Sequence, residues 1–174
     1  MTAALPIPRA IWSGTLEEFL GPGSLVAATF AIDGHDAEYE LYREVPYELA
    51  AAWTSADGHH SVHVVADEDW EPPTAVLIEN RTGDTVGFYA GGELWIDAEH
   101  RGRGLSTPLI VCLVDRLGKA AYDNALGIGF SAAGHAAHAA AHRSVVQRAI
   151  EAGIRVPSRV RAAVVSNGAA PPRP

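Results

Sequence analysis

The sequence predicts an α/β (α+β) fold, in which a mixed, mainly antiparallel central sheet is flanked by helices. Strand-like runs occur both before and after helix-like segments, which is typical of a sheet covered by helices. Two of these runs flank the turn residues Asn80, Arg81, Thr82, Gly83 and Asp84, a good hairpin signal that favours antiparallel pairing. The 174 residues fit one domain with a full core, and no internal repeat interrupts them.

The first part of the chain, residues 1–73, predicts several short elements. The helix with the clearest start covers residues 15–20, because Thr15 can act as N-cap and Glu18 follows three residues later. The other expected elements are strands at residues 25–32 and 38–45 around an Asp-Gly-His-Asp turn, a short helix at residues 46–54 with Pro46 in its first turn, and a strand at residues 61–66.

The second part gives a clearer pattern. Thr107 and Pro108 offer an N-cap and a first-turn proline for a helix that runs to about Leu117. The first half of this helix is apolar on every side, so we expect it to lie against a sheet and to be covered again. The remaining elements are strands at residues 74–79, 85–89, 93–97 and 125–131, an alanine-rich helix at residues 136–152 that stops at Gly153, a last strand at residues 159–165, and a frayed end at residues 167–174.

Composition and charge exclude several classes of function. The net charge of −8, with one lysine among thirteen basic residues, argues against a nucleic-acid partner, which needs a basic face. The acidic balance is compatible with a cationic substrate such as an amine. No apolar run reaches the ~18–20 residues that span a bilayer, and the N-terminus lacks a basic-then-apolar signal. The single Cys112 cannot form a disulfide or a thiolate zinc site within the chain, so a cytoplasmic location is expected.

The stretch "RGRGLS" lies between the expected strand at residues 93–97 and the buried helix. The first N–H groups of a helix have no intrahelical partner, and the helix dipole favours an anion at that end. Gly102 and Gly104 let the backbone approach a ligand, while Arg101 and Arg103 supply charge and forked donors. A strand, a glycine turn and a helix N-terminus in this order predict a phosphate site. An exposed basic turn that only connects strand to helix is the alternative.

This stretch resembles the acyl-CoA-binding turn of the GNAT superfamily of N-acyltransferases, whose pattern is Arg/Gln-x-x-Gly-x-Gly/Ala after a strand. Serine replaces the last small residue here, and the resemblance covers residues 74–154. The family's strand and turn imply main-chain pairing of the pantetheine arm at Ile96 and Ala98, and cofactor binding at Arg101, Gly102, Arg103, Gly104, Leu105, Ser106 and Thr107.

The resemblance implies acetyl-CoA, or another acyl-CoA, as co-substrate. Members of the family transfer the acyl group directly to a primary amine, on a small molecule or a peptide, in a ternary complex. Many members use a tyrosine on a helix as the acid, four residues before a Gly-Phe pair. Gly153 and Ile154 match that pair, which places Ala149 where the tyrosine is expected. Family members often pair, and unpaired strands in residues 25–45 would need a partner, so a homodimer is expected.

Three histidines, His135, His138 and His142, are spaced to share one face of the alanine-rich helix. His142 falls where the family often places an asparagine near the cofactor, and we expect it to act as acid or base, with a pKa suited to neutral pH. A zinc site is an alternative, but neither carboxylate nor thiol accompanies the three rings, so no metal is expected. The third interpretation is that all three are ordinary polar positions on the helix surface.

For a base, Glu93 and Asp97 alternate onto one strand face. A solvated strand edge is the alternative there, and Tyr89, Tyr122 and Cys112 are more typical of packing. Two functions therefore compete: an acetyl-CoA-dependent N-acetyltransferase, and a GNAT-like binding or regulatory module without catalysis, which the missing tyrosine suggests. A toxin that acylates aminoacyl-tRNA is disfavoured by the net charge of −8.

Overall fold

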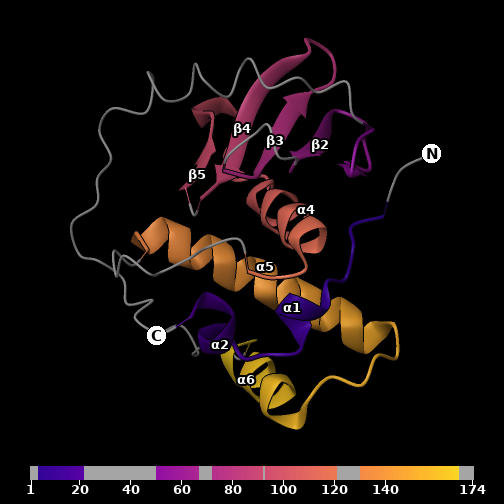
Figure 1. The fold of residues 1–174 in the computed structure, drawn as a ribbon, viewed down its shortest axis with the longest axis vertical. Coiled ribbons are helices and arrows are strands. Elements are labelled where there is room, and N and C mark those ends of the chain that lie inside the picture. The colour runs from indigo at the N-terminus through magenta and orange to yellow at the C-terminus, as the bar shows by residue number, and fades with distance from the viewer. Residues whose placement is uncertain (1–3, 22–49, 67–71, 92, 121–129, 169–174) are drawn as a thin grey trace, which may run out of the picture.

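The computed structural model describes residues 4–21, 50–66, 72–91, 93–120 and 130–168 (Figure 1). Within these residues there are five strands: β1 (Trp53–Thr54), β2 (His60–Val65), β3 (Thr74–Glu79), β4 (Asp84–Ala90) and β5 (Glu93–Ile96). They form one sheet in chain order, and each neighbouring pair is antiparallel. The expected α+β class with a mainly antiparallel sheet is confirmed. The strands predicted at residues 61–66, 74–79, 85–89 and 93–97 are confirmed to within about one residue at each end.

The helices are α1 (Arg9–Trp12), α2 (Leu16–Leu20), α4 (Ser106–Leu117), α5 (Ala132–Glu151) and α6 (Ser158–Gly168), with the 3₁₀ helix η1 (Ala98–His100) before α4. Figure 1 shows α4 directly beneath the sheet, with α5 under α4 and the three remaining helices farther from the sheet. The helix α4 contacts β2, β3 and β4 on one side and α5 on the other. The prediction of a buried helix covered on both faces is therefore confirmed.

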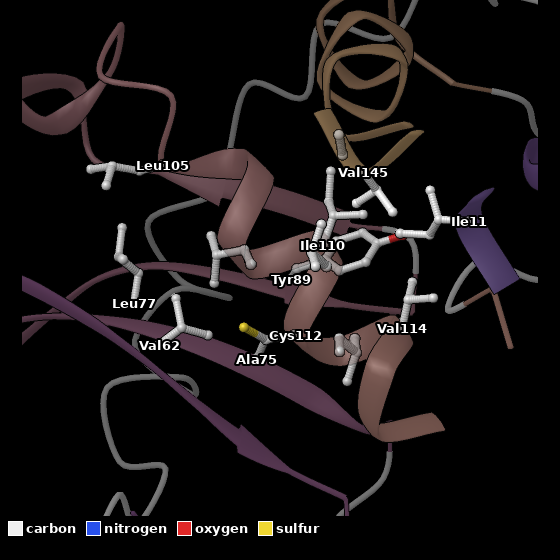
Figure 2. Close-up of a cluster of buried hydrophobic side chains, with 14 of the residues drawn as sticks. Ile11, Val62, Ala75, Leu77, Tyr89, Leu105, Ile110, Cys112, Val114 and Val145 are labelled. Carbon is white, nitrogen blue, oxygen red and sulfur yellow. The ribbon is translucent and has the colours of Figure 1, made fainter. Parts of the chain in front are cut away.

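The main core lies between the sheet and the helices. Along the strands, Val62, Ala75 and Leu77 point towards α4, whose residues from Pro108 to Val114 are all buried. Figure 2 shows Tyr89 of β4 among Ile110, Val145 and Ile11, which belong to α4, α5 and α1. The alternate residues of the same strands form a second, smaller cluster on the opposite face of the sheet, made of Val65, Val76, Ile78, Phe88 and Ala90 with Trp95 packed against it.

The approach of β5 to β4 depends on a glycine. A Cβ atom built on Gly87 would lie 2.9 Å from the carbonyl oxygen of Trp95 and 3.2 Å from a side-chain carbon of Ile96. The register between β3 and β4 shifts at Leu77 and Ile78, which leaves Val86 as an extra residue on β4. This close approach lies opposite Ile96, the last residue of β5, directly before the turn that leads to α4.

The N-terminal capping prediction holds in detail. Thr15 is the N-cap of α2, its hydroxyl oxygen accepts from the Glu18 N–H at 3.3 Å, and the Glu18 carboxylate accepts from the Thr15 N–H at 2.8 Å. Helix α1 was not expected from the sequence, because its four residues are too few to show a helical period. Helix α5 begins four residues earlier than predicted, since Ser131 caps it through a 3.0 Å bond from the Gly134 N–H.

The strand predicted at residues 159–165 is wrong, because this segment lies in α6. Val160 and Val164 are four residues apart, so in a helix they share one face, and both pack with Val146 and Ala149 of α5. The β-branched residues suggested a strand, and contact with α5 overrides that propensity.

The helix predicted at residues 46–54 is wrong at its end, where Trp53 and Thr54 pair with β2 as strand β1. Residues 46–49 of that prediction lie outside the described residues. The strands predicted at residues 25–32 and 38–45, almost all of the one at residues 125–131, and most of the predicted frayed end also lie outside them.

Candidate functional site

The turn between β5 and α4 has the shape that the sequence suggested. Strand β5 ends at Ile96, η1 follows, and residues 101–105 lead into α4 at Ser106; we call residues 101–107 the Arg-Gly turn. Gly102 and Gly104 have φ angles of 75° and 74°, in the left-handed region that favours glycine. No atom lies within 4 Å of a Cβ built on either residue, so the backbone is bare on its outer side.

Both arginines of the turn are exposed and are oriented by main-chain oxygens. The Arg101 Nε donates to the carbonyl of Ile96 at 2.7 Å, and an Nη of Arg103 donates to the carbonyl of Glu99 at 3.1 Å. A guanidinium carries five N–H donors in a rigid fork, so one such bond fixes its direction without using up its capacity. The turn therefore presents two oriented positive groups beside a bare backbone.

The start of α4 differs from the prediction in two ways. Thr107 is not the N-cap: the helix begins at Ser106 after Leu105, which offers no side-chain cap. Leu105 is only 6% exposed, and its burial in the main core fixes the start of the helix. The Thr107 N–H, expected to be free, donates to the Gly104 carbonyl at 3.2 Å. A helix start without a side-chain cap keeps the positive end of its dipole directed at solvent or at an anion.

Ile96 and Ala98 lie where main-chain contact with a ligand was expected. Because the Asp97 N–H bonds to the Val86 carbonyl at 2.9 Å and Ile96 pairs with Gly87, the main-chain groups of Ile96 face away from β4. The carbonyl of Ile96 already accepts from Arg101. The carbonyl of Ala98 accepts from the Arg101 N–H at 3.4 Å. The structure thus places Ile96 and Ala98 at the turn, and the carbonyl of each residue already accepts a hydrogen bond from Arg101.

The two carboxylates expected on one strand face occupy different settings. Glu93 is exposed at the start of β5, on the face where Trp95 stacks over Phe88 at a centroid distance of 6.2 Å. Asp97 lies just past the strand, and its carboxylate accepts from the Glu99 N–H at 3.3 Å as the cap of η1. The carboxylate of Glu93 is therefore open to a ligand, whereas that of Asp97 already orders the backbone before the turn.

The histidines of α5 are not ordinary surface positions. His138 and His142 are 1% and 2% exposed, so the interpretation of three polar surface residues is wrong for these two. The Nδ1 of His138 lies 2.7 Å from the Gly134 carbonyl, which can only accept, so Nδ1 carries the proton. Its Nε2 is then an acceptor, and the Tyr89 hydroxyl donates to it at 2.7 Å. Burial lowers the pKa of His138 from 6.5 to about 4, which keeps the ring neutral.

His142, the expected acid or base, bonds to the N-terminal part of the chain. Its Nε2 donates to the carbonyl of Gly14 at 2.8 Å, and its ring stacks on Phe19 at 6.1 Å. Burial lowers the pKa of His142 as well. The structure thus gives His142 a tethering contact between α5 and the α1–α2 connection, and its lowered pKa moves away from the neutral range that was expected. The role of His142 as acid or base stays a prediction. The bonds of His138 and His142 do not converge on one point, and within the described residues no group of three metal ligands is found.

A second pair of histidines is in contact in the structure and was not predicted from the sequence. His60, at the start of β2, and His100, at the end of η1, approach with Nε2 and Nδ1 3.0 Å apart. No periodicity or motif links two residues that are 40 positions apart, so only the fold could reveal this contact. The pair lies next to the Arg-Gly turn, since His100 directly precedes Arg101 and Arg103 is among the charges that lower the pKa of His60.

Comparison of the chain with family models, curated proteins and solved structures gives no match. Across the described residues, none of the helices combines the length and the apolar character needed to cross a bilayer.

Proposed function

We propose that this protein is an acyl-CoA-dependent N-acyltransferase of the GNAT type, which binds acetyl-CoA at the Arg-Gly turn. The proposal rests on three elements that follow one another along the chain. Strand β5 leads into a turn with two left-handed glycines, and the turn leads into α4, whose start has no side-chain cap. Main-chain N–H groups, a helix dipole and two oriented guanidinium groups together suit a diphosphate. The antiparallel sheet and the doubly covered α4 are compatible with the fold that the resemblance implies.

In the proposed reaction, the amine nitrogen attacks the thioester carbonyl of acetyl-CoA while a base accepts a proton from the amine. The C–S bond then breaks, and the leaving thiolate takes up a proton. Glu93 is the better placed of the two carboxylates to act as base, because it is exposed while Asp97 caps η1. His142 remains the proposed acid or base on helix α5, and solvent is the alternative proton donor, because Ala149 has no group to offer.

The competing proposal is a GNAT-like module that binds a ligand, with or without CoA, but does not catalyse. Two observations favour it. Ala149 is fully buried where the family places its tyrosine, and His142 is 2% exposed with its Nε2 bonded to Gly14. Release of free thiol from acetyl-CoA, followed over a panel of primary amines, separates the two proposals, because a binding module releases none above the uncatalysed rate.

The binding step is tested by calorimetry with CoA. Replacing Arg101 and Arg103 together by glutamine should weaken binding by about 2–4 kcal/mol, at about 1–2 kcal/mol for each charge-assisted contact. The matched control is Arg116→Gln near the end of α4, where the same loss of charge lies far from the turn and should change affinity little. Failure of the wild-type protein to bind CoA would rule out the cofactor and the proposal with it.

A further inference from the structure

The Arg-Gly turn is connected to a distant strand by the His60–His100 pair. The rings meet edge to face, with centroids 5.2 Å apart and an interplanar angle of 86°, so that a nitrogen of one ring points at a nitrogen of the other. In the sheet, β3 and β4 separate β2 from β5. The contact therefore brings η1 back across the end of the sheet from the β5 edge to β2.

His60 is the fixed member of this pair. Its ring is buried, with 5% of the residue exposed, and its backbone is bonded to Ser55 in both directions. The His60 N–H donates to the Ser55 hydroxyl at 2.9 Å, and the Ser55 N–H donates to the His60 carbonyl at 2.8 Å. The Ser55 hydroxyl in turn donates to Asp57 at 2.6 Å. These bonds hold His60 at the start of β2, and none of them involves the Arg-Gly turn.

The bonds that shape the turn itself are local. Arg101 bonds to Ile96, Arg103 bonds to Glu99, and each of these bonds spans five residues or fewer. The first ties Arg101 to the last residue of β5, and the second stays between η1 and the turn, so neither reaches beyond the β5 edge of the sheet. The His60–His100 bond adds a contact with β2, at the residue directly before Arg101.

We propose that His60 is a positioning residue for the anion site: through its bond to His100 it holds Arg101 and Arg103 where they meet the phosphates of acyl-CoA. The inference rests on the proposed function, since it assigns a further residue to the same site. His60 acts through His100 and does not itself contact the ligand.

The chemistry of the pair makes this positioning dependent on pH. One ring must offer a bare nitrogen to the N–H of the other, which remains possible when one ring is protonated. Protonation of both rings would place two N–H groups and two positive charges face to face at 3.0 Å. Burial, then His100, lower the pKa of His60, and Arg103 on the turn acts in the same direction. Asp57 of the β1–β2 connection and Glu79 of β3 raise it, with a smaller combined effect. Because the pKa of His60 is lowered from its ordinary value of 6.5, the bond is intact at and above that pH and is lost only in more acid solution, where both rings carry the extra proton.

The test is CoA affinity measured by calorimetry between pH 5 and pH 8 for the wild type and three variants. His60→Leu and His100→Leu each remove the bond and should weaken CoA binding at pH 7.5 about tenfold, the equivalent of one lost hydrogen bond. His60→Gln offers an amide that can still bond to His100 but does not titrate, so it should restore most of the affinity. It should also reduce the loss of affinity in acid. Because the phosphates of CoA titrate as well, the comparison is between proteins at each pH.

The outcomes separate this inference from the proposed function. Circular dichroism and thermal melting establish that each variant is folded, and the half-exposed His100 keeps the test available if His60→Leu does not fold. If both leucine variants bind CoA as tightly as the wild type, or if His60→Gln keeps the wild-type pH profile, His60 does not position the site. If the wild type itself does not bind CoA, the proposed function fails, and this inference fails with it.

Discussion

The two histidine pairs of this protein sit in different chemical settings. On α5, His138 and His142 each bond to a main-chain carbonyl, which can only accept, so a single tautomer is fixed for each ring. At the end of the sheet, His60 and His100 bond to each other, and either ring can supply the proton. His138, His142 and His60 are all buried. The difference between the regions therefore comes from the partner: a carbonyl acceptor fixes the tautomer of a histidine, whereas a second imidazole leaves the tautomers of the pair open.

Replacing His142 gives the largest expected effect. In His142→Ala a buried ring is lost together with its bond to Gly14, so the free energy of unfolding should fall by about 3–5 kcal/mol. If His142 is also the acid or base, turnover of the folded His142→Gln variant should fall about 10²–10⁴-fold while CoA affinity is unchanged. Urea unfolding and thiol release measure the two effects. His135→Ala, on the less buried part of the same helix, is the control and should change stability by less than about 0.5 kcal/mol.

The pH dependence of the free energy of unfolding tests whether burial keeps the ring of His138 neutral. A histidine whose pKa is lowered by folding adds stability that is complete above about pH 6.5 and is lost as the pH falls towards the folded-state value of about 4. At about 1.4 kcal/mol per pKa unit, the loss over this range is about 3 kcal/mol. Urea unfolding at several pH values measures it. The non-titrating variant His138→Gln should show a shallower decline, and parallel curves for the two proteins would contradict the assignment.

The smallest effect in this set comes from Tyr89→Phe. The change removes only the hydroxyl that donates to His138, and it leaves a buried ring nitrogen without that donor. The free energy of unfolding should fall by about 1–2 kcal/mol. The bond is made only by the neutral ring, so its loss lets the pKa of His138 rise towards its ordinary value, and the difference in stability from the wild type should shrink at acid pH. A variant as stable as the wild type at pH 7 would show that the Tyr89–His138 bond contributes nothing net.

The sequence predicted the parts of the fold that local patterns encode. The hairpin around residues 80–84, the capping box at Thr15 and the doubly buried α4 follow from period, turn chemistry and composition, and the structure has all three. Helix α6 was missed because its β-branched residues favour a strand when they are considered without their contact to α5. The sequence pattern was sufficient to predict an element wherever the contacts that determine its structure lie within that element or between it and one neighbour.

In the candidate site, too, local features could be predicted from the sequence and long-range contacts could not. The Arg-Gly turn is contiguous in sequence, so its glycine conformations could be anticipated from the spacing. The burial of His138 and His142 could not, since it depends on Tyr89 and Gly14, which lie 49 and 128 positions away. The His60–His100 contact depends on η1 crossing the end of the sheet. Helical spacing grouped the histidines of α5 correctly but carried no information on what the rings would meet.

The bonds from α5 to the start of the chain have a consequence for synthesis on the ribosome. His142 bonds to Gly14 and Arg148 bonds to the carbonyl of Pro6, across 128 and 142 positions. The strands, by contrast, pair in the order in which they are made, so the sheet can form as it emerges. The segment with α1 and α2 is made first, yet its partner helix is made near the end. Until α5 is made, Ile11 and Phe19 lack part of the cover that they have in the folded protein, so we expect this early segment to dock late in folding.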